Sequence, residues 1–152
     1  MDGGGDEISD GAVKVTQGPF AGWMTWPESD PYETLAGPFY FQKQPDGTTL
    51  CAMRAERKHM NGGNAMHGGC MLTFADFSLF ALSRKARGAG PSVTISMNSE
   101  FVGPAVIGDL VICTGDVIRA GGSLVFIRGM ITVEDRPVLN FSGVIKKIRA
   151  RS

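Results

Sequence analysis

The sequence lacks the features that mark several specialised classes of protein. Cysteine is scarce, and the three that occur are far apart, with neither a CxxC nor a Cys/His spacing, which argues against a zinc site or a disulfide framework (Cys51, Cys70 and Cys113). No apolar run approaches the ~18 residues of a membrane-spanning helix. The acidic N-terminus is the opposite of a secretory signal peptide. We therefore expect a cytoplasmic protein without a metal or other cofactor.

An excess of charge of one sign is absent as well. Fifteen Lys and Arg residues balance fifteen Asp and Glu residues, which excludes a global electrostatic footprint for nucleic acid or for an anionic membrane. The 152 residues are one domain's worth of protein, and 43% hydrophobic with 20% charged residues is a globular composition. We expect a flexible N-terminal tail over 1–18 and a single domain over 19–152.

The apolar pattern predicts one buried helix between two groups of strands. Residues 69–86 carry apolar side chains on nearly every side, which is typical of a helix buried all round. Arg84, Lys85 and Arg87 suit the negative end of its dipole, and Gly88 ends it. Six strands are expected, two before the helix and four after it, over 39–43, 49–57, 93–101, 110–119, 123–134 and 138–148. Long strands joined by short turns form an antiparallel sheet, and only a curved sheet covers the helix, so the predicted fold class is α+β.

A segment rich in aromatic residues and prolines, 19–38, precedes the first strand. Its prolines exclude a long helix, but one short helical turn is expected over 31–35 after an Asp30 cap. The segment either lines or covers a pocket, or it packs on its own sheet, and the sequence leaves both open.

One carboxylate interrupts the buried helix. Asp76 lies between Leu72 and Phe80 at i±4, and an ionised carboxylate in apolar surroundings is costly unless it is paired. Burial raises the pKa of such a group toward the range of a general base. The alternative is that Asp76 lies at an exposed edge or is satisfied by a neighbouring element or subunit.

The loop before the helix, Met66-His67-Gly68-Gly69, has two glycines that let a substrate approach the backbone closely. The first N–H groups of a helix are unpaired and lie at its positive end, where they suit a carbonyl oxygen that develops negative charge. Paired glycines also serve ordinary turns, and a lone His67 is often a hydrogen-bonded structural residue. Taken alone, the loop decides little.

These residues belong to a longer spaced pattern: Asn61-x5-His67-Gly68-Gly69-x6-Asp76, then Thr94 opening a strand, then Phe101-x2-Pro104-x3-Gly108-Asp109. The pattern resembles the hot-dog-fold acyl-CoA thioesterases, and within them the branch of the phenylacetic-acid-degradation thioesterases. The resemblance covers about residues 35–148. It implies a hot-dog fold, in which a curved antiparallel sheet wraps around one long central helix. It also implies hydrolysis of aromatic or medium-chain acyl-CoA thioesters to free acid and coenzyme A.

The resemblance further implies a role for each matching residue. Asp76 is the general base on water or the nucleophile on the thioester carbon. The Gly68 N–H polarises the thioester carbonyl, and Asn61 positions the carbonyl or the water. His67 orients the loop. Asn64 is a second amide that could take over the role of Asn61.

Thr94 matches a serine or threonine that holds the water near the carboxylate. Strand parity, however, puts Thr94 on the face opposite Val93 and Ile95 and away from the expected core side. On this expectation it reaches the site only if that face meets a dimer partner.

The resemblance implies that coenzyme A is part of the substrate. Its phosphates then need cationic side chains and a backbone that they can approach closely. The candidates for substrate and coenzyme A binding are Gly69, Arg119, Gly121, Gly122, Lys146 and Lys147, with Arg149 beyond them. The basic run near the C-terminus is alternatively a solvated face. The resemblance also implies that the acid and the asparagine of one site come from different subunits, hence a homodimer at minimum and a homotetramer as a dimer of dimers. No nucleic acid or membrane partner is expected.

Two other functions are compatible with a hot-dog domain. One is a non-catalytic acyl-CoA binding or sensing module, which the complete set of candidate catalytic residues disfavours. The other is a hydratase or dehydratase. Those relatives carry a catalytic histidine followed by a proline-rich motif or paired with an aspartate, and neither pattern surrounds His59 or His67.

Overall fold

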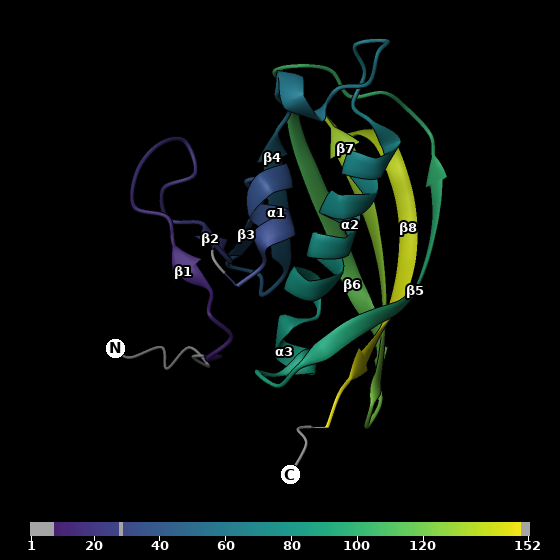
Figure 1. The fold of residues 1–152 in the computed structure, drawn as a ribbon. Helices are drawn as coiled ribbons and strands as arrows, with labels where there is room; N and C mark the ends of the chain where they lie inside the picture. The colour runs from purple at the N-terminus through teal and green to yellow at the C-terminus, as the bar shows by residue number, and fades with distance from the viewer. Residues whose placement is uncertain (1–7, 28, 150–152) are drawn as a thin grey trace.

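A fifteen-residue helix lies across the concave side of a curved sheet in the computed structural model, which describes residues 8–27 and 29–149 (Figure 1). The elements in chain order are β1 (Val13–Lys14), β2 (Met24–Thr25), α1 (Pro31–Ala36), β3 (Tyr40–Lys43), β4 (Thr49–Arg54), a 3-10 helix (Arg57–His59), α2 (Gly68–Leu82), α3 (Arg84–Arg87), β5 (Ser92–Phe101), β6 (Leu110–Ala120), β7 (Leu124–Val133) and β8 (Arg136–Lys147). The hydrogen-bonded order is β1-β2-β3-β4-β6-β7-β8-β5, and every neighbouring pair is antiparallel. The predicted α+β class and curved sheet around one helix are confirmed.

The core forms where α2 packs on the sheet. Phe74, Phe77 and Leu79 of α2 are almost completely buried, together with inward-facing residues of β4, β6, β7 and β8. Phe39 and Phe41 of the first predicted strand pack their rings against Phe77, with centroids 5.4 and 6.2 Å apart. Most apolar side chains of α2 are buried in this core, and Leu72 and Phe80 on its remaining face are partly buried against it. Packing of this one helix therefore organises the domain.

The predicted helix 69–86 is divided into two pieces. Ser83 ends α2, and its Oγ donates to the carbonyl oxygen of Leu79 at 2.6 Å. The four residues of α3 follow, and Gly88 ends them with a φ of 72°, a left-handed conformation that glycine adopts at little cost. Gly88 therefore ends the helical segment as predicted, but Ser83 divides that segment into α2 and α3.

The six predicted strands are present as β3 to β8, with ends that differ by a few residues. The largest difference is in β4, which ends at Arg54 rather than at 57, because the chain leaves the sheet there to form the 3-10 helix. The short helix expected over 31–35 is α1, and Asp30 caps it by accepting a hydrogen bond from the Glu33 N–H at 3.0 Å. The two-residue strands β1 and β2 were not predicted.

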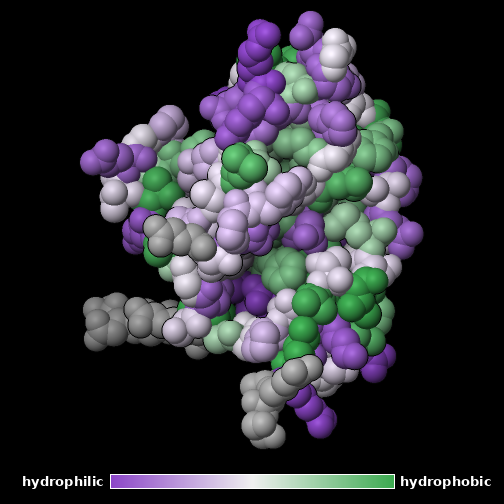
Figure 2. All heavy atoms as spheres, viewed as in Figure 1, coloured by the Kyte–Doolittle hydropathy of each residue, from purple (hydrophilic) through white to green (hydrophobic). Residues whose placement is uncertain are grey.

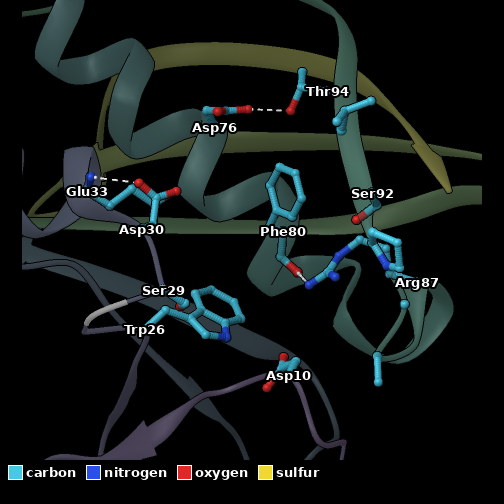
Figure 3. Close-up of a pocket in the computed structure, with 14 residues that line it drawn as sticks. Asp10, Trp26, Ser29, Asp30, Glu33, Asp76, Phe80, Arg87, Ser92 and Thr94 are labelled. Atoms are coloured by element: carbon cyan, nitrogen blue, oxygen red, sulfur yellow. Dashed lines mark hydrogen bonds between the residues drawn. The ribbon is translucent and has the colours of Figure 1, made fainter. Parts of the chain in front are cut away.

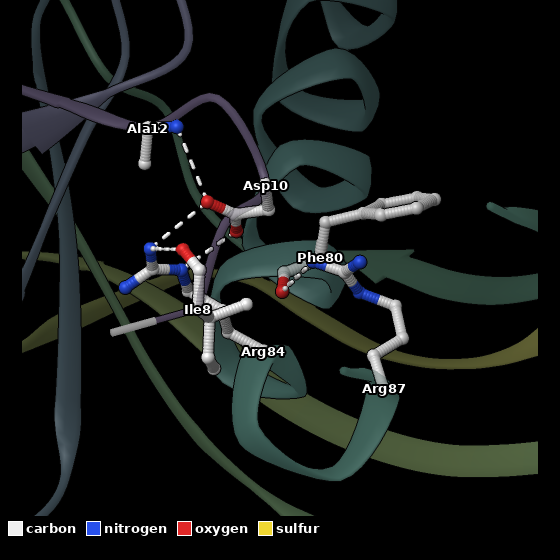
Figure 4. A network of polar contacts seen from close by, with 6 residues as sticks. All are labelled: Ile8, Asp10, Ala12, Phe80, Arg84 and Arg87. Atoms are coloured by element: carbon white, nitrogen blue, oxygen red, sulfur yellow. Dashed lines mark hydrogen bonds and ion pairs between the residues drawn. The ribbon is translucent and has the colours of Figure 1, made fainter. Parts of the chain in front are cut away.

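Contacts with the domain begin inside the segment expected to be a tail. β1 pairs with β2, and Asp10 forms an ion pair with Arg84 at 2.7 Å, with its side chain only 7% exposed (Figure 4). Part of the stretch before residue 19 is therefore attached to the domain, by strand pairing, by this ion pair and by the packing of Ala12 against the core. Residues 1–7 of the expected tail lie outside the described residues.

Strand β5 lies at the edge of the sheet. The face that it directs toward the core is the opposite of the expected one. Val93 and Ile95 are 43% and 52% exposed, whereas Thr94 is half-buried opposite the buried Ile145 of β8. Ile95 is an extra residue in a β-bulge, and the pairing register shifts across it. The expectation that Val93 and Ile95 face the core was wrong, because an edge strand can direct apolar side chains away from its own chain's core. Figure 2 shows apolar side chains gathered on the exposed face over β5.

Within the described residues, no helix has both the length and the apolar character needed to cross a bilayer.

Close approach of strands to α2 depends on Gly115 of β6. A Cβ at this position would contact the carbonyl oxygen of Arg128, and it would lie 2.9 Å from both the Cα of Gly129 and a methyl group of Leu82. Two of these three atoms belong to the backbone of β7, which cannot move without disturbing the ladder. We expect Gly115→Ala to lower the free energy of unfolding by about 1–3 kcal/mol or more in denaturant titrations. Gly122→Ala is the control, since a Cβ added at Gly122 would have no atom within 4 Å; equal stability of the two variants would contradict this packing argument.

Candidate active site

Asp76 lies in the middle of α2, where β5 crosses the helix. The Oγ1 of Thr94 donates a hydrogen bond to Oδ1 of Asp76 at 2.6 Å (Figure 3). Burial raises the pKa of Asp76, the hydrogen bond from Thr94 lowers it, and the nearby charge of Asp30 raises it, with a net increase. The structure thus brings these two predicted residues together within one protomer. The expectation that Thr94 needs a dimer partner to reach the site was wrong. Thr94 was assigned to the face of β5 that points away from the core, but that face points toward α2 of the same protomer.

A cavity of about 630 Å³ opens beside this pair, within the usual size range of small-molecule sites. The segment 19–38 supplies its second wall through Trp26, Asp30 and Glu33. Trp26 also stacks on Phe41 with a centroid distance of 4.6 Å. Both readings of the aromatic segment therefore hold, since it packs on its own sheet and also lines the cavity of Asp76.

Glu33 of α1 brings a second carboxyl group to this cavity. Burial, followed by the charges of Asp30 and Asp76, raises the pKa of Glu33 to about 8. Glu33 is therefore mostly protonated at neutral pH, and the carboxyl groups of the cavity do not all carry charge together.

The HGG loop begins α2 about two turns away from Asp76. Nδ1 of His67 accepts a hydrogen bond from the Gly69 N–H at 2.8 Å, so His67 caps the helix. Gly68 is the first residue of α2, and its N–H is one of those that no helical carbonyl accepts. Phe101 of β5 lies against Gly68, where a Cβ would meet its ring at 3.1 Å. The geometry is that of an oriented loop with a free backbone donor.

Asn61 shapes the loop before this helix. Its Oδ1 accepts hydrogen bonds from the N–H groups of Gly63 and Ala65, at 2.8 and 3.2 Å, which leaves its NH₂ group to donate elsewhere. Asn64 turns the same loop with a φ of 61°, a conformation that asparagine tolerates. The side chain of Asn61 is thus oriented by its own loop, and Asn64 serves the turn.

One protomer does not gather all the predicted residues around one point. Asn61, His67 and Gly68 are absent from the lining of the Asp76 cavity. Gly68 precedes Asp76 by eight residues, which is about 12 Å along the axis of α2. The chain therefore presents two partial sites, one with Asp76 and Thr94 and one with the HGG loop and Asn61.

Three of the predicted coenzyme A residues lie together in a surface hollow formed where β5 begins and β8 ends. Its lining includes Gly122, Lys146 and Lys147, and also Val93, which borders the Asp76 cavity as well. Arg149 and Ser123 complete its polar lining. This hollow therefore adjoins the carboxylate through one shared residue.

The other predicted binding residues lie elsewhere. Arg119 and Gly121 do not line the hollow, and the Gly121 N–H donates to the carbonyl oxygen of Leu124 at 2.8 Å, which is an ordinary turn contact. Gly69 lines a separate depression with His67 and Lys58. The fold thus brings together only some of the residues that were predicted to bind the phosphates of coenzyme A.

Sequence reasoning anticipated that the segment containing Trp26 could line a pocket, but it missed other residues that line the Asp76 cavity. Glu33 carries no motif signal, because it reaches the cavity only through the fold of the segment before β3. Arg87 was interpreted as a helix-dipole cation, yet it is buried and lines the cavity. Among the residues that the structure describes, no cluster of three or more His, Cys, Asp or Glu side chains could hold a metal ion.

The comparisons with known proteins agree with this geometry. The family model of the thioesterase superfamily matches residues 63–139, which include the HGG loop, Asp76 and Thr94. This chain belongs to the thioesterase superfamily. The predicted family and the predicted hot-dog fold are therefore confirmed, and the chain is classed with thioester-hydrolysing enzymes.

Two relatives in sequence and two solved structures illustrate the similarity. The Pseudomonas aeruginosa protein PA0474, named as an esterase, is 31% identical over 76% of this chain and 87% of its own length. The Homo sapiens protein acyl-coenzyme A thioesterase 13 is 32% identical over 62% of this chain and 68% of its own. The E. coli PaaI protein of the phenylacetic acid degradation operon superposes with a TM-score of 0.68 at 22% identity, covering 81% of this chain and 88% of that one. A hypothetical thioesterase of Streptococcus pneumoniae, solved with coenzyme A, gives 0.65 at 19% identity, covering 75% and 88%.

The hydrogen bond from Thr94 stabilises the ionised form of Asp76. Without it the pKa of Asp76 rises further, so the acid limb of the kcat/KM profile for thioester hydrolysis moves to higher pH. We expect Thr94→Val to show this shift and to lose about tenfold or more in kcat/KM near neutral pH. Thr94→Ser keeps the hydroxyl and is the matched control. An unchanged acid limb in Thr94→Val would show that this contact does not tune the active carboxylate.

Proposed function

We propose that this protein hydrolyses acyl-CoA thioesters to a free acid and coenzyme A. The observation that carries the proposal is a half-buried carboxylate, Asp76, held by Thr94 at the wall of a cavity in a chain of the thioesterase superfamily. The name of the human relative and the coenzyme A bound to the Streptococcus pneumoniae structure support the choice of thioester. Aromatic and medium-chain acyl groups are the proposed substrates.

Asp76 is the group that starts the reaction. As a general base it takes a proton from water while the water oxygen attacks the thioester carbon, and Thr94 holds that water near the carboxylate. The tetrahedral intermediate then expels the coenzyme A thiolate as the C–S bond breaks, and the proton on Asp76 passes to the sulfur. Direct attack by Asp76 as a nucleophile, followed by hydrolysis of the anhydride, is the other form of the same proposal.

The HGG loop stabilises the developing oxyanion. The free N–H of Gly68 points from the positive end of α2, and the NH₂ group of Asn61 adds a second donor. His67 acts through its cap on the helix, which keeps the Gly68 backbone in position. No metal and no cofactor beyond the coenzyme A of the substrate enters this scheme.

A homodimer is the minimum unit that this scheme requires. Asp76 and the HGG loop of one chain lie about 12 Å apart along α2, which is too far for both to contact one thioester group. Pairing of two protomers supplies the loop of one chain to the carboxylate of the other. We propose a homodimer that assembles further into a homotetramer, and a cytoplasmic location.

The first test is the loss of the Asp76 carboxylate. Asp76→Asn keeps the shape of the side chain but cannot take a proton, so we expect kcat to fall by about 10²–10⁴-fold. The assay follows thiol release with a chromogenic reagent over aromatic and straight-chain acyl-CoA substrates. Asp116→Asn, at an exposed ion pair with Arg128, is the control. Near-normal turnover of Asp76→Asn would overturn the mechanism, and tight acyl-CoA binding by a wild-type protein that hydrolyses none would favour a sensing module.

The second test concerns the phosphates of coenzyme A. Replacing both Lys146 and Lys147 by Gln removes two cations from the hollow beside the Asp76 cavity. We expect KM for acyl-CoA to rise about threefold to tenfold, while the KM of an N-acetylcysteamine thioester, which carries no phosphate, stays the same. Lys43→Gln, an exposed lysine of β3, is the control. An equal change for both substrates would place the phosphates elsewhere.

A further inference from the structure

Arg87, the last residue of α3, is a buried cation that forms no ion pair with any acidic side chain of the described residues, although the charge of Asp10 acts on it and raises its pKa. It lines the Asp76 cavity, is only 8% exposed, and takes part in none of the ion pairs among the described residues. Its Nε is also the one buried side-chain nitrogen or oxygen in that part of the chain without a hydrogen-bond partner. Burying an unpaired charge is costly, and burial lowers the pKa of Arg87. A cation retained at such a cost needs a partner that binds there.

The guanidinium of Arg87 is held in one orientation. Its Nη2 donates to the carbonyl oxygen of Phe80 at 3.1 Å, and its central carbon lies 4.9 Å from the centre of the Phe80 ring (Figures 3 and 4). These contacts use one edge and one face of the group. Nε is unpaired but buried, and Nη1, which forms no hydrogen bond with the described residues, is left to donate to a ligand. A guanidinium fixed in this way is suited to receive a planar acceptor such as a carboxylate.

The acidic residues nearby are otherwise committed. Asp10 receives two hydrogen bonds from Arg84, at 2.7 and 2.9 Å, and one from the Ala12 N–H at 3.1 Å. Asp30 and Glu33 lie on the opposite side of the cavity from Arg87 (Figure 3), and the raised pKa of Glu33 keeps it mostly uncharged at neutral pH. The charge of Arg87 is therefore free to act on a ligand.

The cavity connects Arg87 with Asp76, the carboxylate that is proposed to act on the thioester. Asp76 and Phe80 are one turn apart on α2, roughly 6 Å along the helix axis, and Arg87 is hydrogen-bonded to the carbonyl oxygen of Phe80. The side chains of Trp26 and Phe80 are apolar parts of the wall of the cavity that contains Asp76 and Arg87. An acyl chain that starts at Asp76 thus reaches Arg87 after a short apolar stretch.

We infer that this cavity takes short acyl groups that end in a carboxylate, which Arg87 binds through charge-assisted hydrogen bonds. The inference rests on the proposed thioesterase function and adds to its substrates a further class, the coenzyme A monothioesters of short dicarboxylic acids. Arg87 then determines specificity and does not take part in bond breaking.

The test compares glutaryl-CoA with pentanoyl-CoA, which has the same chain length but no terminal carboxylate. We expect wild-type kcat/KM to favour glutaryl-CoA by about tenfold or more, the range of one charge-assisted hydrogen bond. Arg87→Met abolishes this preference, and Arg87→Lys retains part of it, since an ammonium keeps the charge but not the planar fork. Lys85→Met, an exposed cation on the same helix, leaves both the preference and the basal activity unchanged. Thermal unfolding of each variant identifies any loss of fold.

Three results would overturn the inference. The first is a wild-type enzyme that hydrolyses pentanoyl-CoA as well as or better than glutaryl-CoA. The second is a preference that persists in a folded Arg87→Met variant. The third is a stronger preference for 5-hydroxypentanoyl-CoA, which would show that Asp30 and Glu33, and not Arg87, select the acyl end.

A binding measurement separates this inference from the proposed reaction. Calorimetry with Asp76→Asn compares the affinities for the two thioesters when neither is consumed. Tighter binding of glutaryl-CoA that requires Arg87 supports the inference even if the wild-type protein hydrolyses no acyl-CoA, which would overturn the proposed function alone. Equal affinities for the two thioesters overturn the inference while leaving hydrolysis intact.

Discussion

Burial of most of α2 within the curve of the sheet is the constraint on which the rest of the structure depends. A helix with apolar side chains all round cannot lie on a flat surface, so the sheet must curve around it. The strands come close enough only because residues such as Gly115 and Gly143 leave room for the side chains of Leu82 and Leu79. The single carboxylate of the helix, Asp76, must then lie where the sheet ends, because only an edge strand can offer it a hydroxyl and an opening to a ligand.

The same geometry divides the candidate chemistry between two places. The free N–H groups of α2 lie at its start, and the carboxylate lies two turns further along. A thioester is too small to contact both in one protomer. The exposed apolar side chains of β5, such as Val93 and Ile95, lie beside the carboxylate, on the face that a second protomer would cover. Pairing of protomers would therefore bury this face and complete the proposed site together.

The N-terminal segment adds a second wall to the cavity of this scaffold. It lies outside the part matched by the thioesterase family, and it supplies Trp26 and Glu33 to the wall of the cavity. The ion pair of Asp10 with Arg84 attaches the segment and engages the carboxylate of Asp10, and Arg87 has no ion-pair partner among the described residues. The cavity is thus lined both by the matched part of the chain, which includes Asp76 and Arg87, and by the segment before it.

The sequence by itself determined the elements whose signals are local. The apolar run of α2, the alternation of β3 to β8 and the Asp30 cap each follow from neighbouring residues, and the spaced motif around Asp76 identified the family. Only the tertiary structure decided the face of Thr94, the ion pair of Asp10 and the burial of Arg87. A bulge at Ile95 shifts the strand register, and Ser83 divides the helical segment into α2 and α3. Residues distant in the sequence meet through these irregularities, so periodicity alone carries no signal for them.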